Sequence, residues 1–325
     1  MELDLWSDGA PSLGFQMTHS QQECTVRVAS VEFALSQTPQ RAGPTGLGGL
    51  GAGLGGGVAR LGGGDDEVGD VDGHDVDVDG GDSNSSRSSP RILLDMTRVL
   101  WPSSLPLADF IMEQALHNQG DEMCRIPLLA RAAAKRRLNQ PTGIRALELG
   151  AGCAGLPGMA LAALVADEVT LTDVASALPL LEENVRRFTD AAAASGNTRC
   201  GKIDVRAFDW LDGEHIADMA SDLGYDVVVG TDIAYADSLL EPLVRATMAV
   251  LKPGGVLLLS ENLRSRRMHH EARAAFGKPG YFAVTVPQVG TFADHLEEEA
   301  ALLVGTWQCE SEARAMRRKL AVCKK

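Results

Sequence analysis

The chain has 325 residues and a formal net charge of −14 at pH 7. This acidic balance disfavours an extensive nucleic-acid-binding surface, and no apolar run approaches the ~20 residues that span a bilayer. The acidic start MELDLWSDGAP lacks the basic and apolar regions of a signal peptide. The six cysteines show no C-x-x-C pair, which favours reduced thiols in a cytoplasmic or nuclear protein and gives no indication of a metal site.

Residues 1–90 divide into two parts. Residues 41–90 hold 16 of the 35 glycines, no aromatic residue, and nine acidic residues against three arginines, which is −6 of the −14. Such a segment cannot offset the entropy of ordering its backbone, so we expect a disordered insertion. We predict a β element within residues 1–40. Its strand 25–36 and a strand at 91–101 are expected to form one hairpin, whose turn the insertion replaces at small entropic cost.

Residues 91–325 are expected to form one domain. A helix is predicted at 105–116, and from Arg145 onward strands alternate with helices, which indicates βαβ units and a parallel sheet. The predicted strands are 145–150, 168–173, 202–210, 225–232 and 256–261, and the predicted helices are 156–166, 176–194, 214–222, 237–251 and 264–276. Strands 281–288 and 301–309 follow, joined only by a loop, which favours an antiparallel pair. The expected fold is therefore an α/β, Rossmann-like sheet of five parallel strands plus an antiparallel terminal hairpin, with helices on both faces.

The most informative segment is ALELGAGCAGLPG, residues 146–158. It predicts a strand, a glycine turn and a helix start, the geometry that presents backbone N–H groups to a nucleotide, with Gly150, Ala151 and Gly152 as the expected contacts. Gly150, Gly152 and Gly155 also satisfy the G-x-G-x-x-G pattern of NAD-binding domains. Asp173 follows the next strand and could hold ribose hydroxyls with either NAD or S-adenosylmethionine (AdoMet).

Glu148 distinguishes between NAD and AdoMet as the expected ligand. A carboxylate inside an apolar strand is costly unless it has a partner. It could face the charged amino group of a methionine moiety, which a nicotinamide dinucleotide lacks. The other interpretation is that Glu148 accepts a hydrogen bond from the backbone at the end of the strand.

Six tracts together resemble the seven-strand AdoMet-dependent methyltransferases, and within them the protein-lysine methyltransferase branch. They are TRVLWPSSLPLADFI (97–111), LELGAG (147–152), LTDVASALPLLEENV (171–185), FDWLDG (208–213), VVVGTDIAYADSLLEPL (227–243) and LKPGGVLLL (251–259). That branch acts on chaperones, valosin-type ATPases, elongation factors and calmodulin. One departure is Ala154, where the family usually has its third glycine. Gly155 follows one position later, which indicates a one-residue insertion in the turn.

The resemblance implies a set of site residues. Asp209 and Trp210 would lie against the adenine, Trp101 would close over the cofactor, and Thr231 would lie beside it. Asp232 and Tyr235, the D-x-x-Y pattern after the fourth strand, would be catalytic. They would hold and orient the substrate amine.

We therefore expect AdoMet-dependent methylation of a lysine in a protein substrate, with no metal, membrane or nucleic-acid partner. Three alternatives remain open. The same fold could methylate histidine, arginine or a small molecule. The chain could be an inactive methyltransferase-like binding protein, for which the displaced glycine is the only indication. It could also be an NAD(P)-dependent oxidoreductase, which the KPGG turn and the antiparallel end strands disfavour.

Overall fold

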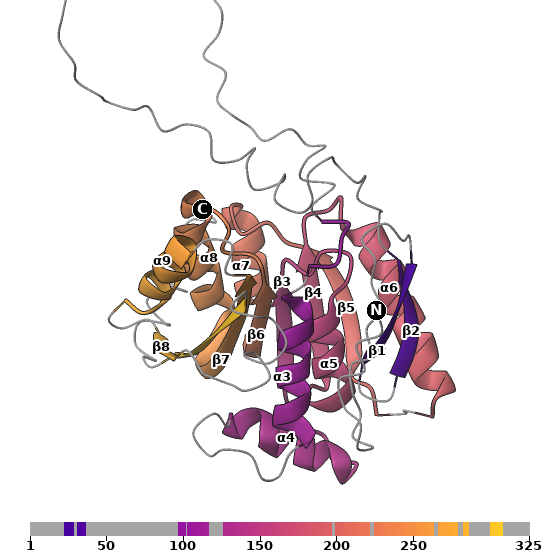
Figure 1. Cartoon of the computed structure of the whole chain (residues 1–325). Coiled ribbons are helices and arrows are strands. Elements are labelled where there is room, and N and C mark those ends of the chain that lie inside the picture. Colours follow the sequence, from indigo (N-terminus) through magenta and orange to yellow (C-terminus); the bar gives the residue numbers. More distant parts are fainter. Residues whose placement is uncertain are drawn as a thin grey trace, which may run out of the picture.

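A mostly parallel sheet forms the centre of the computed structural model, which describes residues 23–28, 31–36, 97–101, 103–116, 126–196, 199–221, 224–262, 266–278, 282–285 and 300–307 (Figure 1). Seven strands follow one another in the order β5-β4-β3-β6-β7-β9-β8. Their bounds are β3 Arg145–Leu149, β4 Glu168–Asp173, β5 Lys202–Ala207, β6 Tyr225–Thr231, β7 Leu251–Asn262, β8 Phe282–Thr285 and β9 Ala300–Trp307. Strands β3 to β7 are parallel, whereas β9 runs antiparallel to both β7 and β8. The predicted five parallel strands and antiparallel terminal pair are confirmed.

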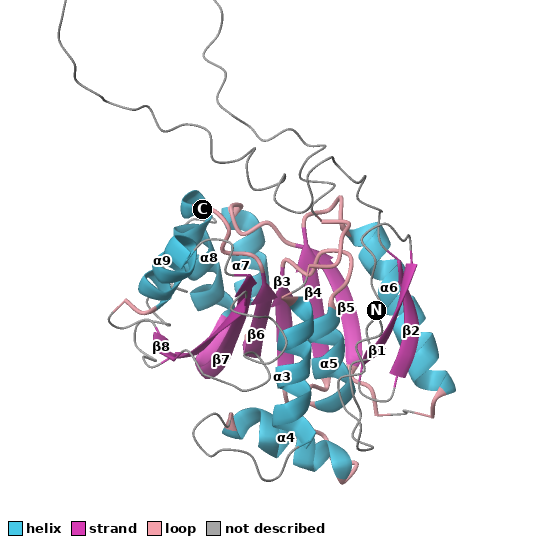
Figure 2. Ribbon diagram, viewed as in Figure 1, coloured by secondary structure: helices cyan, strands magenta, loops and turns pink. Residues whose placement is uncertain are grey.

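Helices cover both faces of this sheet, as Figure 2 shows. One face carries α3 (Ser104–Leu116), α4 (Pro127–Arg137), α5 (Leu156–Leu164) and α6 (Leu178–Ala194), and the other carries α7 (Gly213–Ser221), α8 (Asp237–Val250) and α9 (Arg266–Phe276). The strand residues divide between two cores by alternation, since Ala146 of β3 belongs to the first and its neighbour Leu147 to the second. Burial on both faces explains why β6 reads as an almost continuous apolar run. Within the described residues, no helix has the length and apolar character needed to cross a membrane.

The prediction for the N-terminal hairpin is wrong in its pairing. Strands β1 (Glu23–Val28) and β2 (Val31–Ser36) pair with each other in a separate two-stranded sheet, with Val28 opposite Val31. Residues 23–36 therefore contain both strands of this pair, and residues 91–101 supply neither of them. Residues 97–101 form no strand, and 91–96 lie outside the described residues, as does the predicted insertion at 41–90.

Two further elements differ from the sequence prediction. Helix α4 was not predicted, although Pro127 stands at its start and three basic residues occupy its last turn, both of which are typical helix-end signals. Strand β7 begins at Leu251 rather than at Val256. The LKPGG tract thus lies within this strand. The register of β6 and β7 shifts there, because Tyr225 pairs with Leu251 whereas Val227 pairs with Val256.

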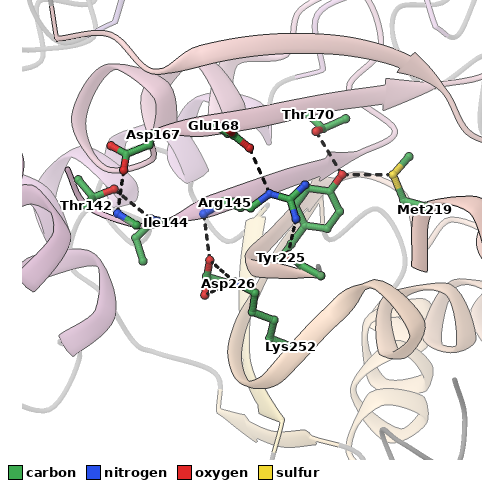
Figure 3. A network of polar contacts seen from close by, with 12 residues as sticks. Thr142, Ile144, Arg145, Asp167, Glu168, Thr170, Met219, Tyr225, Asp226 and Lys252 are labelled. Atoms are coloured by element: carbon green, nitrogen blue, oxygen red, sulfur yellow. Dashed lines mark hydrogen bonds and ion pairs between the residues drawn. The ribbon is translucent and has the colours of Figure 1, made fainter. Parts of the chain in front are cut away.

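A polar network fixes the amino ends of four parallel strands (Figure 3). The Arg145 guanidinium lies 5.0 Å from the centroid of the Tyr225 ring and donates to Glu168 at 3.2 Å. The Arg145 backbone N–H donates to Asp226, whose carboxylate also pairs with Lys252 at 2.9 Å. These contacts lie at the amino ends of the strands, opposite to the carboxyl ends where sheets of this kind bind ligands.

A buried amide side chain, that of Asn184, helps to join the hairpin to the domain. Asn184 of α6 accepts a hydrogen bond from the Ser36 N–H at 2.8 Å and donates to the Ser36 carbonyl at 2.9 Å. It also donates to the carbonyl of Cys153 at 2.7 Å, in the glycine turn. The Asn184 side chain and Cys153 are both 0% exposed, so the Cys153 carbonyl has no water as an alternative partner.

We predict that Asn184→Ala lowers the free energy of unfolding by about 2 kcal/mol, because buried backbone groups lose their partner. The measurement is urea unfolding of the full chain. The control is Glu182→Gln on the exposed side of the same helix, which should change stability by no more than about 0.5 kcal/mol. Equal midpoints for Asn184→Ala and the wild type would contradict this role.

Candidate functional site

The glycine turn between β3 and α5 occupies the position where doubly wound sheets bind ligands. The chain leaves β3 for β4 on one side and later returns to form β6 on the other, and such switch points bind ligands at the carboxyl ends of the strands. Gly150, Gly152 and Gly155 have φ values of +64°, +59° and +56°, a region that disfavours other residues. A Cβ at Gly155 would lie 2.8 Å from Leu171 Cδ1 of β4. The displaced third glycine therefore allows close packing of α5 on the sheet.

Two buried carboxylates hold this turn. Asp173, the last residue of β4, accepts hydrogen bonds from the N–H groups of Gly152 and Val174, both at 2.7 Å. Glu148 Oε2 accepts the N–H of Gly158, in the first turn of α5, at 2.7 Å. The Glu148 side chain is 1% exposed. The observed contact is thus the backbone bond considered for Glu148 from sequence, and its contact with a methionine amino group stays a prediction.

Burial sets the electrostatics of both acids. It raises the pKa of Glu148 from 4.5 to about 8, an effect that the Gly158 hydrogen bond opposes and the nearby Asp173 charge reinforces. It likewise raises the pKa of Asp173 from 3.8 to about 6, against the two backbone hydrogen bonds. Near neutral pH, Glu148 holds a proton for much of the time.

The loop after β5 brings an aromatic ring to the turn. Trp210 Cη2 lies 3.4 Å from the position that a Cβ on Gly150 would occupy. The backbone leading to it is tied to β4, since the Phe208 N–H donates to the Asp173 carbonyl at 2.8 Å. Asp209 Oδ1 accepts the Leu211 N–H at 2.8 Å, which shapes the turn. The predicted residues Trp210 and Asp173 are therefore brought to the same glycine turn.

The loop after β6 carries the D-x-x-Y pattern. Asp232 has a φ of +53°, and positive φ values in residues other than glycine cluster at functional sites. The next residue, Ile233, packs against the turn, because its Cγ2 lies 2.6 Å from a Cβ placed on Gly150. Tyr235 is 44% exposed. Partial burial, followed by the negative charges of Asp173 and Asp209, raises the pKa of its hydroxyl.

The start of α3 covers the same edge. The carbonyl of Thr97 lies 3.4 Å from a Cβ placed on Gly152, so the segment that carries Trp101 passes over the turn. Trp101 is half-buried, and its carbonyl accepts the Ser104 N–H at 3.1 Å. The Ser104 hydroxyl lies 3.2 Å from that of Thr231. The structure thus gathers the predicted residues at one edge of the sheet, while their roles toward a cofactor stay predictions.

Sequence reasoning missed three residues of this region. Ser103 and Ser104 lie at the start of α3, and Glu261 lies near the carboxyl end of β7. Glu261 carried a usable signal, since an acid that follows a run of apolar strand residues is the pattern that singled out Asp173. Among the described residues, no group of three His, Cys, Asp or Glu side chains is arranged to hold a metal ion.

The sheet order, with five parallel strands and an antiparallel pair, defines a Rossmann-like α/β fold with the glycine turn at its switch point. The sequence pattern of the lysine methyltransferase family matches residues 91–276, more than half of the chain, and the chain belongs to this family.

Three curated relatives are similar to it. Protein N-lysine methyltransferase METTL21A of Xenopus tropicalis is 27% identical over 176 residues, covering 54% of this chain and 65% of the relative. Protein N-terminal and lysine N-methyltransferase EFM7 of Yarrowia lipolytica is 35% identical, covering 35% and 45%. EEF1A lysine methyltransferase 3 of Mus musculus is 30% identical, covering 45% and 56%. The chain thus spans between 45% and 65% of the length of these relatives.

The raised pKa of Glu148 predicts a pH dependence of stability. Because the pKa is about 8 in the folded protein against an ordinary value of 4.5, the folded state binds the proton more tightly than the unfolded state. The stabilisation is complete below the lower value and is lost as the pH rises toward the higher one. Glu148→Gln removes this titration and keeps an acceptor for the Gly158 N–H. The stability of the wild type relative to Glu148→Gln should fall by up to about 1.4 kcal/mol per pH unit across this window.

Urea unfolding of both proteins at about pH 5 and about pH 8 measures this difference. Asp173 is present in both proteins, so its own titration largely cancels. Parallel stability profiles for the two proteins would contradict the assignment of a neutral, buried Glu148.

Proposed function

We propose that this protein is an AdoMet-dependent methyltransferase that transfers a methyl group to a lysine side chain of a protein substrate. The observation that carries the proposal is that Asp173, Trp210 and the loop of Asp232 and Tyr235 meet at one glycine turn, in a chain of the lysine methyltransferase family. The family membership favours this activity over the methylation of a small molecule and over NAD(P)-dependent oxidation.

The residues at the turn fit AdoMet. Each carboxylate oxygen of Asp173 accepts one backbone N–H and retains a second acceptor site, which suits a pair of ribose hydroxyls. Trp210 offers a flat ring beside Gly150, as an adenine requires. When bound, AdoMet supplies an electrophilic methyl group on its sulfonium sulfur. The backbone of Gly150, Ala151 and Gly152 would face the cofactor, and Trp101, Asp209 and Thr231 would add further contacts to it.

The protein's own task is to prepare the amine. A free lysine has a pKa of ~10.4 and is almost fully protonated at pH 7. The Asp232 carboxylate would attract the incoming ammonium group, and the exposed face of Tyr235 would orient it through a cation–π contact. The proton must pass to solvent before the nitrogen lone pair can form the new N–C bond as the S–C bond breaks. Alignment of this kind can supply roughly 7–11 kcal/mol of the barrier reduction.

The proposed substrate is a protein that presents a lysine. The name of one relative includes EEF1A, and that of another includes both N-terminal and lysine methylation. The test should therefore detect methylation of the protein N-terminus as well as of lysine. Translation factors, chaperones, valosin-type ATPases and calmodulin-like proteins are the candidates that the family resemblance supplies.

The direct test is labelling of a cognate lysate with tritiated AdoMet, followed by mass spectrometry of the labelled band. We expect label on a protein lysine with the wild type and none above background with Asp232→Asn. Label on histidine, on arginine or only in the small-molecule fraction would overturn the lysine assignment. AdoMet binding without any transfer between pH 7 and 9 would support the inactive binding protein instead.

Two variants should separate transfer from cofactor binding. Asp232→Asn removes the negative charge of the carboxylate, and asparagine, like aspartate, tolerates a positive φ. It should lower kcat by about 100-fold or more, while the Kd for AdoMet changes by less than about threefold. Asp173→Ala should raise that Kd by about 10- to 100-fold, because charge-assisted bonds are lost.

The matched control is Asp237→Asn, an exposed acid five positions along that pairs with Arg267 on the surface. It should leave both constants near wild type. If Asp232→Asn lost AdoMet binding and Asp173→Ala lost only transfer, the two roles would have to be exchanged.

A further inference from the structure

The loop from Thr231 to Tyr235 depends on support from outside itself. Asp232 adopts a φ of +53°, which is unfavourable for a residue with a side chain and persists only where neighbouring structure enforces it. Its neighbour Ile233 is buried against the glycine turn. The geometry of the D-x-x-Y pattern is therefore determined by what surrounds the loop.

One support comes from α3. Ser103 directly precedes the first residue of this helix, is 1% exposed, and donates its hydroxyl hydrogen to Asp232 Oδ2. The neighbouring Ser104 hydroxyl meets that of Thr231 at 3.2 Å. Because α3 is buried in the core through Leu107, Ala108 and Ile111, the Ser103 hydroxyl is a fixed point that limits rotation of the Asp232 carboxylate.

The other support comes from the carboxyl end of β7. The Ser260 carbonyl accepts the Asp232 N–H at 2.9 Å, and Glu261 Oε1 accepts the Ala234 N–H at 3.1 Å. Glu261 is 6% exposed, so its carboxylate exchanges little with water. Ala234 lies between Asp232 and Tyr235. This hydrogen bond therefore fixes the backbone that determines the position of the Asp232 side chain relative to that of Tyr235.

We infer that Ser103 and Glu261 are positioning residues for methyl transfer. They hold Asp232 and Tyr235 from two sides in the arrangement that receives the substrate amine. The inference rests on the proposed function and deepens it, because it assigns roles to two residues outside the D-x-x-Y pattern. Neither residue is expected to touch the transferred methyl group.

The test compares variants that lose each bond with variants that keep it. Ser103→Ala and Glu261→Ala should each lower kcat by about tenfold, with the Kd for AdoMet within about twofold of wild type. Ser103→Thr keeps the hydroxyl and Glu261→Gln keeps an acceptor oxygen, so both should restore most of kcat. The matched controls Ser238→Ala and Glu241→Ala, at exposed positions of α8, should leave kcat unchanged.

A double-mutant comparison separates positioning from general stability. Residues that act as one unit have non-additive effects on kcat, so Ser103→Ala should add less than about a twofold loss in an Asp232→Asn background. A full tenfold further loss in that background would overturn the inference for Ser103. Failure of Glu261→Gln to restore kcat, in a protein that melts like the wild type, would overturn it for Glu261.

Amide hydrogen exchange of residues 231–235 supplies a readout without turnover. Glu261→Ala should raise exchange at Ala234 by at least about tenfold, while exchange in the core strand β6 stays unchanged. Unchanged exchange at Ala234 would overturn the inference even if the enzyme is active. If the wild type transferred no methyl group, the proposed function would fail, and the exchange experiment would still decide whether Glu261 holds the loop.

Discussion

The site depends on protein acceptors for the buried N–H groups in and after the glycine turn, because water does not reach these groups. Unpaired backbone donors in such a place are costly, and two carboxylates from neighbouring strands provide the partners. Asp173 binds the turn at Gly152, and Glu148 binds the start of α5 at Gly158. The turn is therefore fixed relative to β3, β4 and α5 at once. The cost is the burial of two acids, which appears as the raised pKa of each.

The same turn contacts the loop that carries Asp232. Ile233 occupies the space beside Gly150 that a larger residue at that position would need, so the glycine turn and the loop after β6 pack against each other. From the other direction, α3 and β7 hold the loop through Ser103 and Glu261. The site is thus assembled from the β3–α5 turn, the end of β4, the loops after β5 and β6, the start of α3 and the end of β7, and none of these six contains it alone. This arrangement suits a reaction in which alignment of an amine supplies most of the rate.

Much of this could be predicted from the sequence. The alternation of strands and helices predicted the parallel sheet, and polar residues at strand ends, such as Asp173 and Asp232, predicted the edge where the site lies. The hairpin pairing was wrong, because strand patterns indicate strands without naming their partners. Ser103 and Asn184 were missed because a single buried hydroxyl or amide has no periodic signal. For Glu148, the sequence predicted that the acid needs a partner, and only the packing of α5 on β3 identifies the Gly158 N–H as that partner.

The central claim is that the glycine turn serves AdoMet in a lysine methyltransferase rather than a dinucleotide, whose G-x-G-x-x-G pattern it also satisfies. Isothermal titration calorimetry of the full chain with AdoMet and with NAD, in separate experiments, tests it most directly. We expect saturable binding of AdoMet with one site per chain and no heat above dilution with NAD. Binding of NAD without binding of AdoMet would contradict it.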